Sequence, residues 1–322
     1  MGKDIRYSIV IPVFNEEAVI EQTYQQLKKV MDSTNEPYEL IFVNDGSSDR
    51  SDSLIKGFCA GNEAVKLISF SRNFGHQIAI TAGMDYAAGA AVVIIDSDLQ
   101  DPPELILQMI AKWQEGYEVV YAKRLERQGE TFFKKQTARL FYRILRACTE
   151  TDIPVDTGDF RLIDRKVCAA LKQLPEKNRY VRGMVSWVGF RQTALEYNRD
   201  PRLAGKTKYS LKKMLKLSLD GLTSFSFKPL KLAGYTGFFC LALALLYMVL
   251  LLLAKLGGHA PIDAWNIVII CQLVLTGFVL TMMGIMGEYI CRIYDETRNR
   301  PLYIIRECYQ NEGKERTVKK IG

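Results

Sequence analysis

Short apolar runs alternate with segments of helical periodicity as far as Ala122, and this alternation constrains the fold more than any other feature. The expected strands are Tyr7–Val13, Glu39–Val43, Val65–Phe70, Val92–Ile95 and Glu118–Ala122. Helices are expected from Glu16 to Met31, from Gln77 to Ala88 and from Leu105 to Glu115. This alternation is typical of a doubly wound, mostly parallel α/β sheet with flanking helices.

Each expected strand is followed by a polar cluster. The clusters are Phe14–Glu17, Asn44–Asp49, Arg72–His76, Asp96–Gln100 and Lys123–Arg124. Because ligands bind at the carboxyl ends of the strands in such sheets, we expect these clusters to converge on one site.

The stretch Val92–Glu104, VVIIDSDLQDPPE, carries the strongest chemical signal. Asp96 and Asp98 follow an expected buried strand, where two carboxylates so close together repel each other unless a cation lies between them. Hard oxygen ligands suit Mg²⁺ or Mn²⁺, which would keep coordination positions for phosphate oxygens and water. The alternative is a solvated acidic turn, but the apolar strand before the pair and the DPPE turn after it favour a metal site.

Composition and motifs exclude several classes. The 322 residues carry a net charge of +7, which by itself fits nucleic acid, a membrane surface or a phosphorylated substrate. No GxGxxG follows the first strand, and Asp200 stands where a P-loop ending at Gly205–Thr207 would have its first glycine. The seven cysteines contain no CxxC pair, and His76 and His259 are far apart. We therefore expect no dinucleotide enzyme, P-loop enzyme, disulfide framework or His-rich zinc site.

Two uncharged stretches near the C-terminus, Leu232–Ala254 and Ala264–Gly287, are each long enough for a helix that crosses a bilayer. The link between them has few basic residues, whereas Lys and Arg flank both stretches on their outer sides. The positive-inside rule then predicts a plasma (inner) membrane protein with its catalytic domain and both termini in the cytosol. Two buried core helices are the alternative.

Two further segments, 131–148 and 208–227, combine apolar residues at helical spacing with many Lys and Arg side chains. They are expected to be amphipathic juxtamembrane helices, with ordinary solvated helices as the alternative. The charged sequence from Glu307 onward is expected to fray. The expected organisation is a cytosolic domain, 1–228, a two-helix membrane hairpin within 229–291 (helices at about 232–254 and 264–288) and a cytosolic tail, 292–322.

Five motifs in order, together with the two expected spans, resemble a known family over nearly the whole chain. The motifs are VIPVFNEE (10–17), VNDGSSD (43–49), SRNFGHQ (71–77), DSDLQDPPE (96–104) and DTGDFRL (156–162). They are similar to family-2 glycosyltransferases of the GT-A fold that make polyprenyl-phosphate sugars, such as dolichol-phosphate mannose synthase and undecaprenyl-phosphate glucosyltransferases of the GtrB type. The chain lacks the QxxRW motif and the many spans of the processive cellulose and hyaluronan synthases. Outside the resemblance, Gly158 before Asp159 suggests a tight turn, either at a site or a plain one.

The resemblance implies a role for each matching position. The nucleotide sugar would be held by Pro12, Phe14, Glu16, Val43, Asp45, Ser97, Lys123 and Arg124. The metal, Mg²⁺ or Mn²⁺, would be bound by Asp96, Asp98 and Gln100. Asp98 and Asp159 would be the catalytic residues, with Asp159 near the acceptor, and Arg202 and Lys208 would contact the acceptor phosphate or the diphosphate.

The implied reaction is inverting transfer of a sugar from a nucleotide sugar to undecaprenyl or another polyprenyl phosphate, for glycosylation of the cell envelope. UDP is the first expectation for the nucleotide and GDP-mannose the alternative. A lipid phosphate has a second pKa near ~6 and is largely ionised at neutral pH, so Asp159 is expected to position the acceptor rather than to remove a proton. A nucleotidyl- or phosphotransferase and a non-catalytic, membrane-tethered sugar-nucleotide sensor are the rival hypotheses. Nucleic acid is not an expected partner, and homo-oligomerisation stays open.

Overall fold

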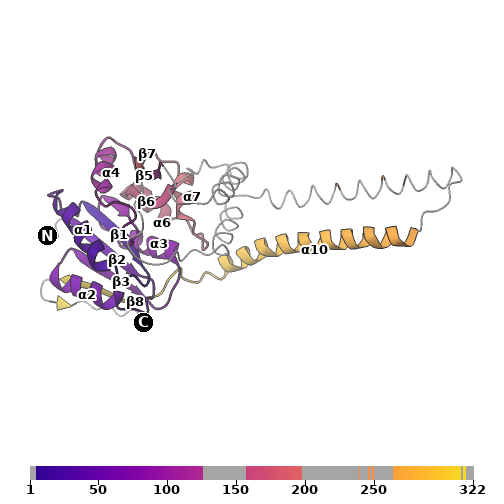
Figure 1. Ribbon diagram of the computed structural model, residues 1–322, viewed down its shortest axis with the longest axis horizontal. Coiled ribbons are helices and arrows are strands. Elements are labelled where there is room, and N and C mark those ends of the chain that lie inside the picture. Colours follow the sequence, from indigo (N-terminus) through magenta and orange to yellow (C-terminus); the bar gives the residue numbers. More distant parts are fainter. Residues whose placement is uncertain are drawn as a thin grey trace. The chain divides into compact units, whose positions relative to one another are not determined.

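The computed structural model describes residues 5–125, 157–197, 264–312 and 315–316, and the isolated positions Phe239, Leu246 and Val249. The chain divides into two compact units. The first contains a sheet with its covering helices and includes the C-terminal strands, and the described part of the second is mainly one long helix, α10, Ala264–Thr297 (Figure 1).

A nine-stranded sheet organises the first unit. Its elements in chain order are β1 (Tyr7–Val13), α1 (Ile20–Asp32), β2 (Tyr38–Asn44), α2 (Ser51–Gly61), β3 (Val65–Phe70), α3 (His76–Tyr86), β4 (Ala91–Ile94), α4 (Leu105–Gln114), β5 (Val119–Arg124), β6 (Thr157–Asp164), α6 (Arg165–Lys172), α7 (Val181–Trp187), β7 (Gln192–Tyr197), β8 (Ile305–Glu312) and β9 (Glu315–Arg316). The strand order is β7-β5-β6-β4-β1-β2-β3-β8-β9. The strands β1 to β4 form parallel pairs, whereas β6 and β8 run antiparallel to their neighbours. The sheet is therefore mixed: β1 to β5 and β7 run in one direction, as expected of a mostly parallel sheet, and β6 and β8 are reversed.

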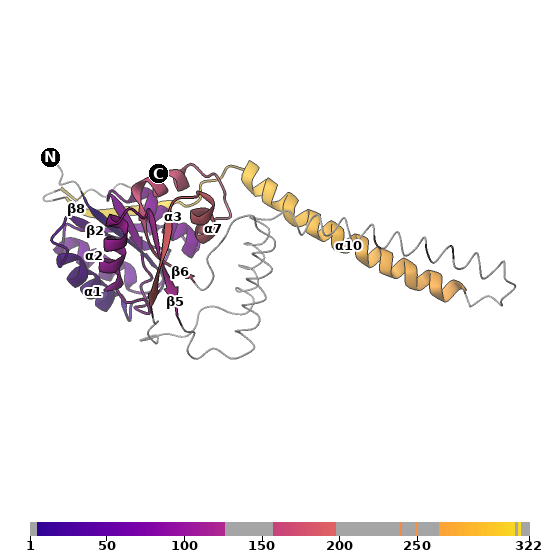
Figure 2. The ribbon, with the colours of Figure 1, turned by 90° about the horizontal axis from the view of Figure 1, so that it is seen from above.

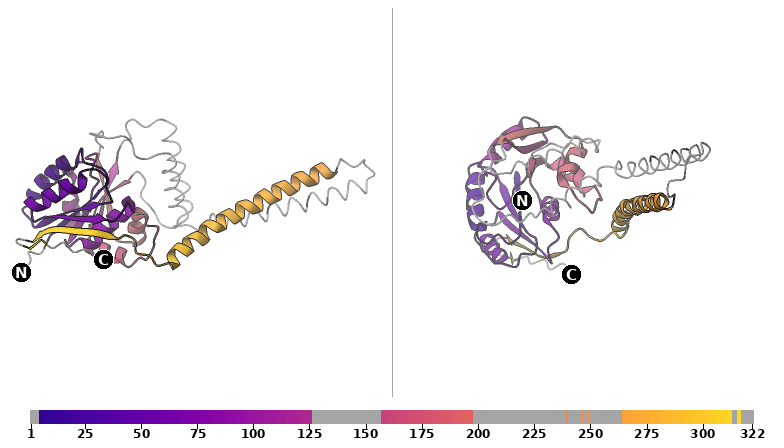
Figure 3. Two further views of the ribbon diagram at one scale, coloured as in Figure 1. Left: turned by 90° about the horizontal axis from the view of Figure 1, so that it is seen from below. Right: turned by 45° about the vertical axis from the view of Figure 1, so that its right-hand side comes forward.

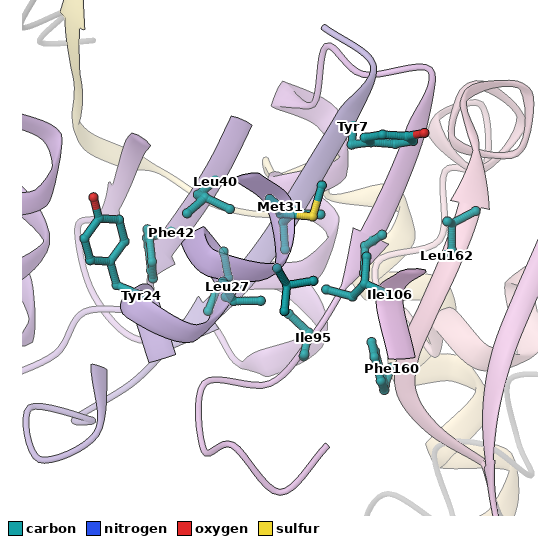
Figure 4. Close-up of a cluster of buried hydrophobic side chains, with 14 of the residues drawn as sticks. Tyr7, Tyr24, Leu27, Met31, Leu40, Phe42, Ile95, Ile106, Phe160 and Leu162 are labelled. Atoms are coloured by element: carbon teal, nitrogen blue, oxygen red, sulfur yellow. The ribbon is translucent and has the colours of Figure 1, made fainter. Parts of the chain in front are cut away.

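Helices cover both faces of the sheet (Figures 2 and 3). Since successive strand residues point to opposite faces, one set packs against α1, α2 and α4, and Figure 4 shows Leu27 and Met31 of α1 near Ile106 of α4. The other set packs against α3 and α6. Helix α3 lies so close to β1 that a Cβ on Gly83 would come within 2.1 Å of a methyl carbon of Val10.

The five strands and three helices expected from the sequence are confirmed, with shifts at their ends. The largest shift is at the start of α1, which begins at Ile20 and not at Glu16. The backbone N–H groups of Asn15, Glu16 and Glu17 donate to side chains between Ser47 and Ser51, so this stretch is a loop held against the loop after β2.

The DTGDFRL motif was expected to contain a tight turn, and that expectation was wrong. Thr157–Asp164 is the strand β6, which lies between β4 and β5 and is antiparallel to both. The strand carries Asp159 and Arg161 on one face, so the apolar pattern that marks a buried strand is missing from its sequence.

The sequence from Glu307 onward was expected to fray, and for its described residues, 307–312 and 315–316, this was wrong. Strand β8 pairs antiparallel with β3 and forms a hairpin with β9. Just before β8, the Tyr303 ring stacks on Phe70, and its hydroxyl donates to Asp85 of α3 at 3.0 Å. Residues that were assigned to a separate tail therefore complete the edge of the sheet.

Removing residues 301–322 is expected to destabilise the first unit by roughly 3 kcal/mol, because the aromatic stack and the buried Ile305 side chain are lost and the β3 edge is exposed. For a domain of this size the melting temperature should fall by about 6–12 °C. Thermal unfolding of the purified protein measures this. A truncation after Arg316 retains β8 and is the control, and equal melting temperatures for the two would contradict the prediction.

Among the residues that the structure describes, no helix combines the length and the apolar character that a membrane span requires. The second predicted span lies within the sequence of α10. The first lies almost entirely outside the described residues, as do the predicted surface helices at 131–148 and 208–227. These elements stay predictions.

Candidate active site

The carboxyl ends of β1 and β4 form the switch point of the sheet, because β2 and β3 continue on one side of β1 and β4 lies on the other. Such a switch point is where open α/β sheets bind ligands. The loops that follow β1 and β4 contain Phe14, Glu16, Asp96 and Asp98, and the structure therefore brings the two strongest sequence motifs to one place.

Asp45 fixes the loop that follows β3. Its side chain is buried and accepts hydrogen bonds from the backbone N–H groups of Phe74, at 2.6 Å, and Gly75, at 3.0 Å. Burial raises the pKa of Asp45, although these N–H groups and the charge of His76 oppose the shift. The role predicted for Asp45 toward the nucleotide stays a prediction; in this structure its carboxylate holds the loops after β2 and β3 together.

Gly46 makes this close approach possible. Its φ is +70°, and a Cβ would lie 2.6 Å from the carbonyl carbon of Arg72. The Gly46→Ala substitution is therefore expected to destabilise the protein by about 1–3 kcal/mol, because the adjoining loops must move apart. Gly57→Ala is the matched control: Gly57 lies inside α2 with nothing within 4 Å, so the change should stabilise by about 0.5–1 kcal/mol. Equal unfolding free energies for the two variants in denaturant titrations would refute this account.

The loop after β4 holds its two carboxylates in an unusual backbone conformation. Leu99 is buried with a φ of +54°, which is rare for a residue with a branched side chain. Oδ1 of Asp98 accepts the N–H of Gln100, and the carbonyl of Ser97 accepts the Thr23 hydroxyl from α1 at 2.7 Å. Local strain that neighbouring contacts maintain in this way is typical of functional sites.

Asp96 has the features of a metal ligand. Its Oδ1 is buried and accepts no hydrogen bond from the described part of the chain, while the side chain as a whole is 28% exposed. Burial, with added repulsion from Asp159, Asp101 and Asp98, raises the pKa of Asp96 to about 6, although His76 opposes the shift. No group of three or more His, Cys, Asp and Glu side chains within the described ranges forms a metal cage. Two carboxylates with an unsatisfied buried oxygen still fit a Mg²⁺ or Mn²⁺ ion whose other ligands are phosphate oxygens and water.

Asp159 lies beside Asp96 because β6 pairs with β4. The register places Arg161 opposite Ile94, so Asp159 falls next to the residues that follow the strand. His76, the first residue of α3, lies between the two carboxylates, with Nε2 at 3.4 Å from Asp96 Oδ1 and at 3.2 Å from Asp159 Oδ2. Arg182 of α7 forms a bidentate ion pair with Asp159, in which Nε donates to Oδ1 at 2.8 Å and Nη2 donates to Oδ2 at 3.1 Å.

These contacts fix the charges of the cluster. Burial alone would lower the pKa of His76, but the Asp96 and Asp159 carboxylates outweigh it and raise the pKa to about 9. Burial alone would raise the pKa of Asp159, but the Arg182 guanidinium and the His76 hydrogen bond hold it well below its usual range. Burial lowers the pKa of Arg161 to about 10, which still leaves it charged at neutral pH. Arg161 and Arg182 therefore place two positive charges beside Asp159 at neutral pH.

The other predicted site residues have mixed positions. Pro12 and Val43 are buried and face each other across β1 and β2, and Phe14 is exposed beyond them. Arg124 donates to the Tyr197 hydroxyl, which donates to Asp101 of the loop after β4, so Arg124 is brought to the site. Lys123 forms an exposed ion pair with Glu196.

The roles predicted for Gln100, Arg202 and Lys208 stay predictions. Gln100 lies half-buried beside Asp98. Arg202 and Lys208 are outside the described residues.

Sequence reasoning missed the side chains that surround Asp159. His76 and Gln77 belong to the SRNFGHQ cluster after the third strand, which was noted, but neither was given a role. The position of that cluster, directly after an expected strand, could have indicated that His76 and Gln77 lie at the site. Arg182 stands in a segment without any motif, and only the fold brings it to Asp159.

Comparisons with known proteins agree with the arrangement. The sequence profile of the family described as Glycosyl transferase family 2 matches residues 8–171. The protein named "Uncharacterized glycosyltransferase YkcC" of Bacillus subtilis (strain 168) is 62% identical over 314 residues, which are 98% of this chain and 97% of the relative. The "SfII prophage-derived bactoprenol glucosyl transferase" of Shigella flexneri is 39% identical over 306 residues, 95% of this chain and 99% of the relative.

Among solved structures, glucosyl-3-phosphoglycerate synthase from Mycobacterium tuberculosis in complex with Mn²⁺, UDP-Glc and phosphoglyceric acid is similar with a TM-score of 0.46 and 20% sequence identity, covering 68% of this chain and 77% of that one. The family profile and the two relatives have a more direct bearing on identity, since the profile spans half of the chain and the relatives align along nearly all of it. The chain belongs to glycosyltransferase family 2 and is a glycosyltransferase.

Proposed function

We propose that this enzyme transfers a sugar from a nucleotide sugar, first of all a UDP-sugar, to undecaprenyl or another polyprenyl phosphate, with inversion at the anomeric carbon. The observation that carries the proposal is the Asp96–Asp98 pair at the switch point of the sheet, in a chain whose relatives along nearly its full length include a bactoprenol glucosyl transferase. GDP-mannose is the alternative donor.

The loops after β1, β2 and β3 would hold the nucleotide, with Phe14 as an exposed aromatic surface for the base. Asp96 and Asp98, with Gln100 as a further ligand, would hold Mg²⁺ or Mn²⁺. When bound, the ion supplies positive charge to the diphosphate leaving group. Arg124, whose Nε donates to the Tyr197 hydroxyl, would stabilise the same negative charge.

The acceptor oxygen would attack the anomeric carbon directly. A phosphate monoester is largely a dianion above its second pKa of ~6, so the attack needs no side chain to remove a proton. Asp159 is strongly acidic, and four hydrogen bonds engage its oxygens, which supports a positioning role and not that of a general base.

A lipid phosphate stays at the membrane surface, so the catalytic unit must be held there. We propose that the uncharged stretches 232–254 and 264–287 form a membrane hairpin that does this, with both termini in the cytosol. Cysteine-accessibility mapping should find position 259 on the far side of the membrane and position 322 on the cytosolic side. A C-terminal reporter that is active only outside the cytosol would contradict this topology.

The function is tested with purified protein, a panel of UDP- and GDP-sugars labelled in the sugar, and undecaprenyl phosphate. Label from one donor class should enter the lipid fraction as a sugar phosphodiester. Transfer of nucleotide or phosphate in its place would identify the rival transferase chemistry, and binding without transfer would identify a sensor.

A further inference from the structure

The accessible groups of the Asp159 cluster are its basic side chains. The Asp159 side chain is 7% exposed, whereas Arg182 is 23% exposed and His76 is 35% exposed. A ligand that enters from solvent therefore meets a guanidinium and an imidazole before it reaches the carboxylate. An anionic ligand suits this order of access, and a ligand that must give a proton to Asp159 does not.

The oxygens of Asp159 are already engaged. Arg182 donates to both of them, and Oδ2 also has His76 at 3.2 Å and the Gln77 amide at 3.1 Å. Four donors therefore lie against this carboxylate, one at Oδ1 and three at Oδ2. The carboxylate therefore serves to hold other groups in place.

Arg182 is held at two points. Its side chain is fixed by the bidentate contact with Asp159, and the N–H of the preceding residue, Val181, donates to Gln77 Oε1 at 3.0 Å. Gln77 thus links the start of α7 to the carboxylate that orients the guanidinium. A planar, permanently charged and pre-oriented guanidinium is the group best suited to bind a phosphate monoester.

We infer that Arg182 binds the phosphate group of the acceptor and that Asp159 is the positioning residue for Arg182. This inference rests on the proposed function, and it assigns the acceptor-phosphate site to α7. A phosphate at this place would lie beside Asp96, and so beside the leaving group of the donor. Its negative charge would face the Arg182 guanidinium, which is permanently positive.

The test compares Arg182→Gln, Arg182→Lys, Asp159→Asn and the double variant Arg182→Gln/Asp159→Asn. Acceptor KM is measured with undecaprenyl phosphate and with a short, soluble polyprenyl phosphate, and UDP binding is measured by calorimetry. Arg191→Gln is the matched control, since Arg191 is an exposed arginine that lies over the Tyr117 ring.

Arg182→Gln should raise the acceptor KM by about tenfold or more for both chain lengths, because a hydrogen bond to a charged group contributes about 1.5–3 kcal/mol. UDP affinity should stay within about twofold of the wild type. Arg182→Lys should recover part of the loss, since it keeps the charge but not the planar fork. The double variant should be no worse than the more impaired single variant, because the two residues act as one unit.

Several results would overturn the inference. An unchanged acceptor KM in Arg182→Gln with intact UDP binding excludes the phosphate contact, as does an effect restricted to UDP, which would place Arg182 at the donor. Additive losses in the double variant exclude the positioning role of Asp159. If Arg182→Gln does not bind UDP because it is misfolded, Arg182→Lys decides by the same acceptor KM. A wild type that transfers no sugar to either lipid would refute the proposed function itself.

Discussion

Replacing Asp98 by Asn should lower kcat by at least ~10²-fold while the protein stays folded. The substitution keeps the size of the side chain, and the amide oxygen can still accept the Gln100 N–H, so the loop should survive. It removes one of the two charges that would bind the divalent ion, and loss of a charge-stabilising group worth about 3 kcal/mol in the transition state corresponds to a loss of that size. Excess EDTA should abolish transfer in the wild type, and Mg²⁺ or Mn²⁺ should restore it.

The controls separate the metal from other effects. Asp32→Asn changes an exposed carboxylate at the end of α1 that pairs with Lys28, and it should leave kcat unchanged. Because burial raises the pKa of Asp96 to about 6, protons should compete with the ion, and more Mg²⁺ should be needed for half-maximal activity as the pH falls below that value. Full activity in excess chelator would refute the metal assignment.

The part of the fold that could be predicted is the part whose burial pattern is simple. Strands β1 to β4 have apolar residues on both faces because helices cover both sides, and such runs are visible in a sequence. Strand β6 is just as buried, but its face toward α3 carries the charged residues Asp159 and Arg161. The partners that make the burial of these charges possible come together only when the chain has folded. Strand β8 is rich in charged and polar residues, and nothing in its own sequence indicates that it pairs with β3, some 240 residues earlier.

The residues of the candidate site also fall into those that the sequence pattern could locate and those that it could not. Asp96 and Asp98 follow a strand that could be recognised, so the sequence located them correctly at the carboxyl edge of the sheet. The partners of Asp159 come from α3 and α7, which are about 80 residues before it and about 20 residues after it in the chain. Such partners depend on the antiparallel pairing of β6 with β4. Because β6 was predicted to be a turn, the contact between Asp159 and Arg182 could not be predicted.

Asp159 should stay ionised over the whole pH range in which activity is measured, so Asp159→Asn should not change the shape of the pH–rate curve. A carboxyl group whose pKa is lowered in the folded state contributes stability that is present above its unfolded pKa of ~4 and is lost as the pH falls through the folded value. Asp159 is therefore ionised, and does not titrate, across the range from about pH 5 to 9 in which activity would be measured. At saturating Mg²⁺, where the ion outcompetes protons at Asp96, the acidic limb of the pH–rate curve should come from the acceptor phosphate, with its second pKa near ~6.

Asp159→Asn should accordingly weaken acceptor use and leave that limb in place. The measurement is kcat/KM for the acceptor against pH, at saturating donor, for wild type and variant, with UDP binding as the check on folding. The size of the loss alone does not decide, because a general base contributes about 10²–10⁴-fold and lost positioning can reach the lower part of that range. The shape does decide: an acidic limb that disappears in the variant would mean that Asp159 takes the proton, against both its low pKa and the four hydrogen bonds that engage its oxygens.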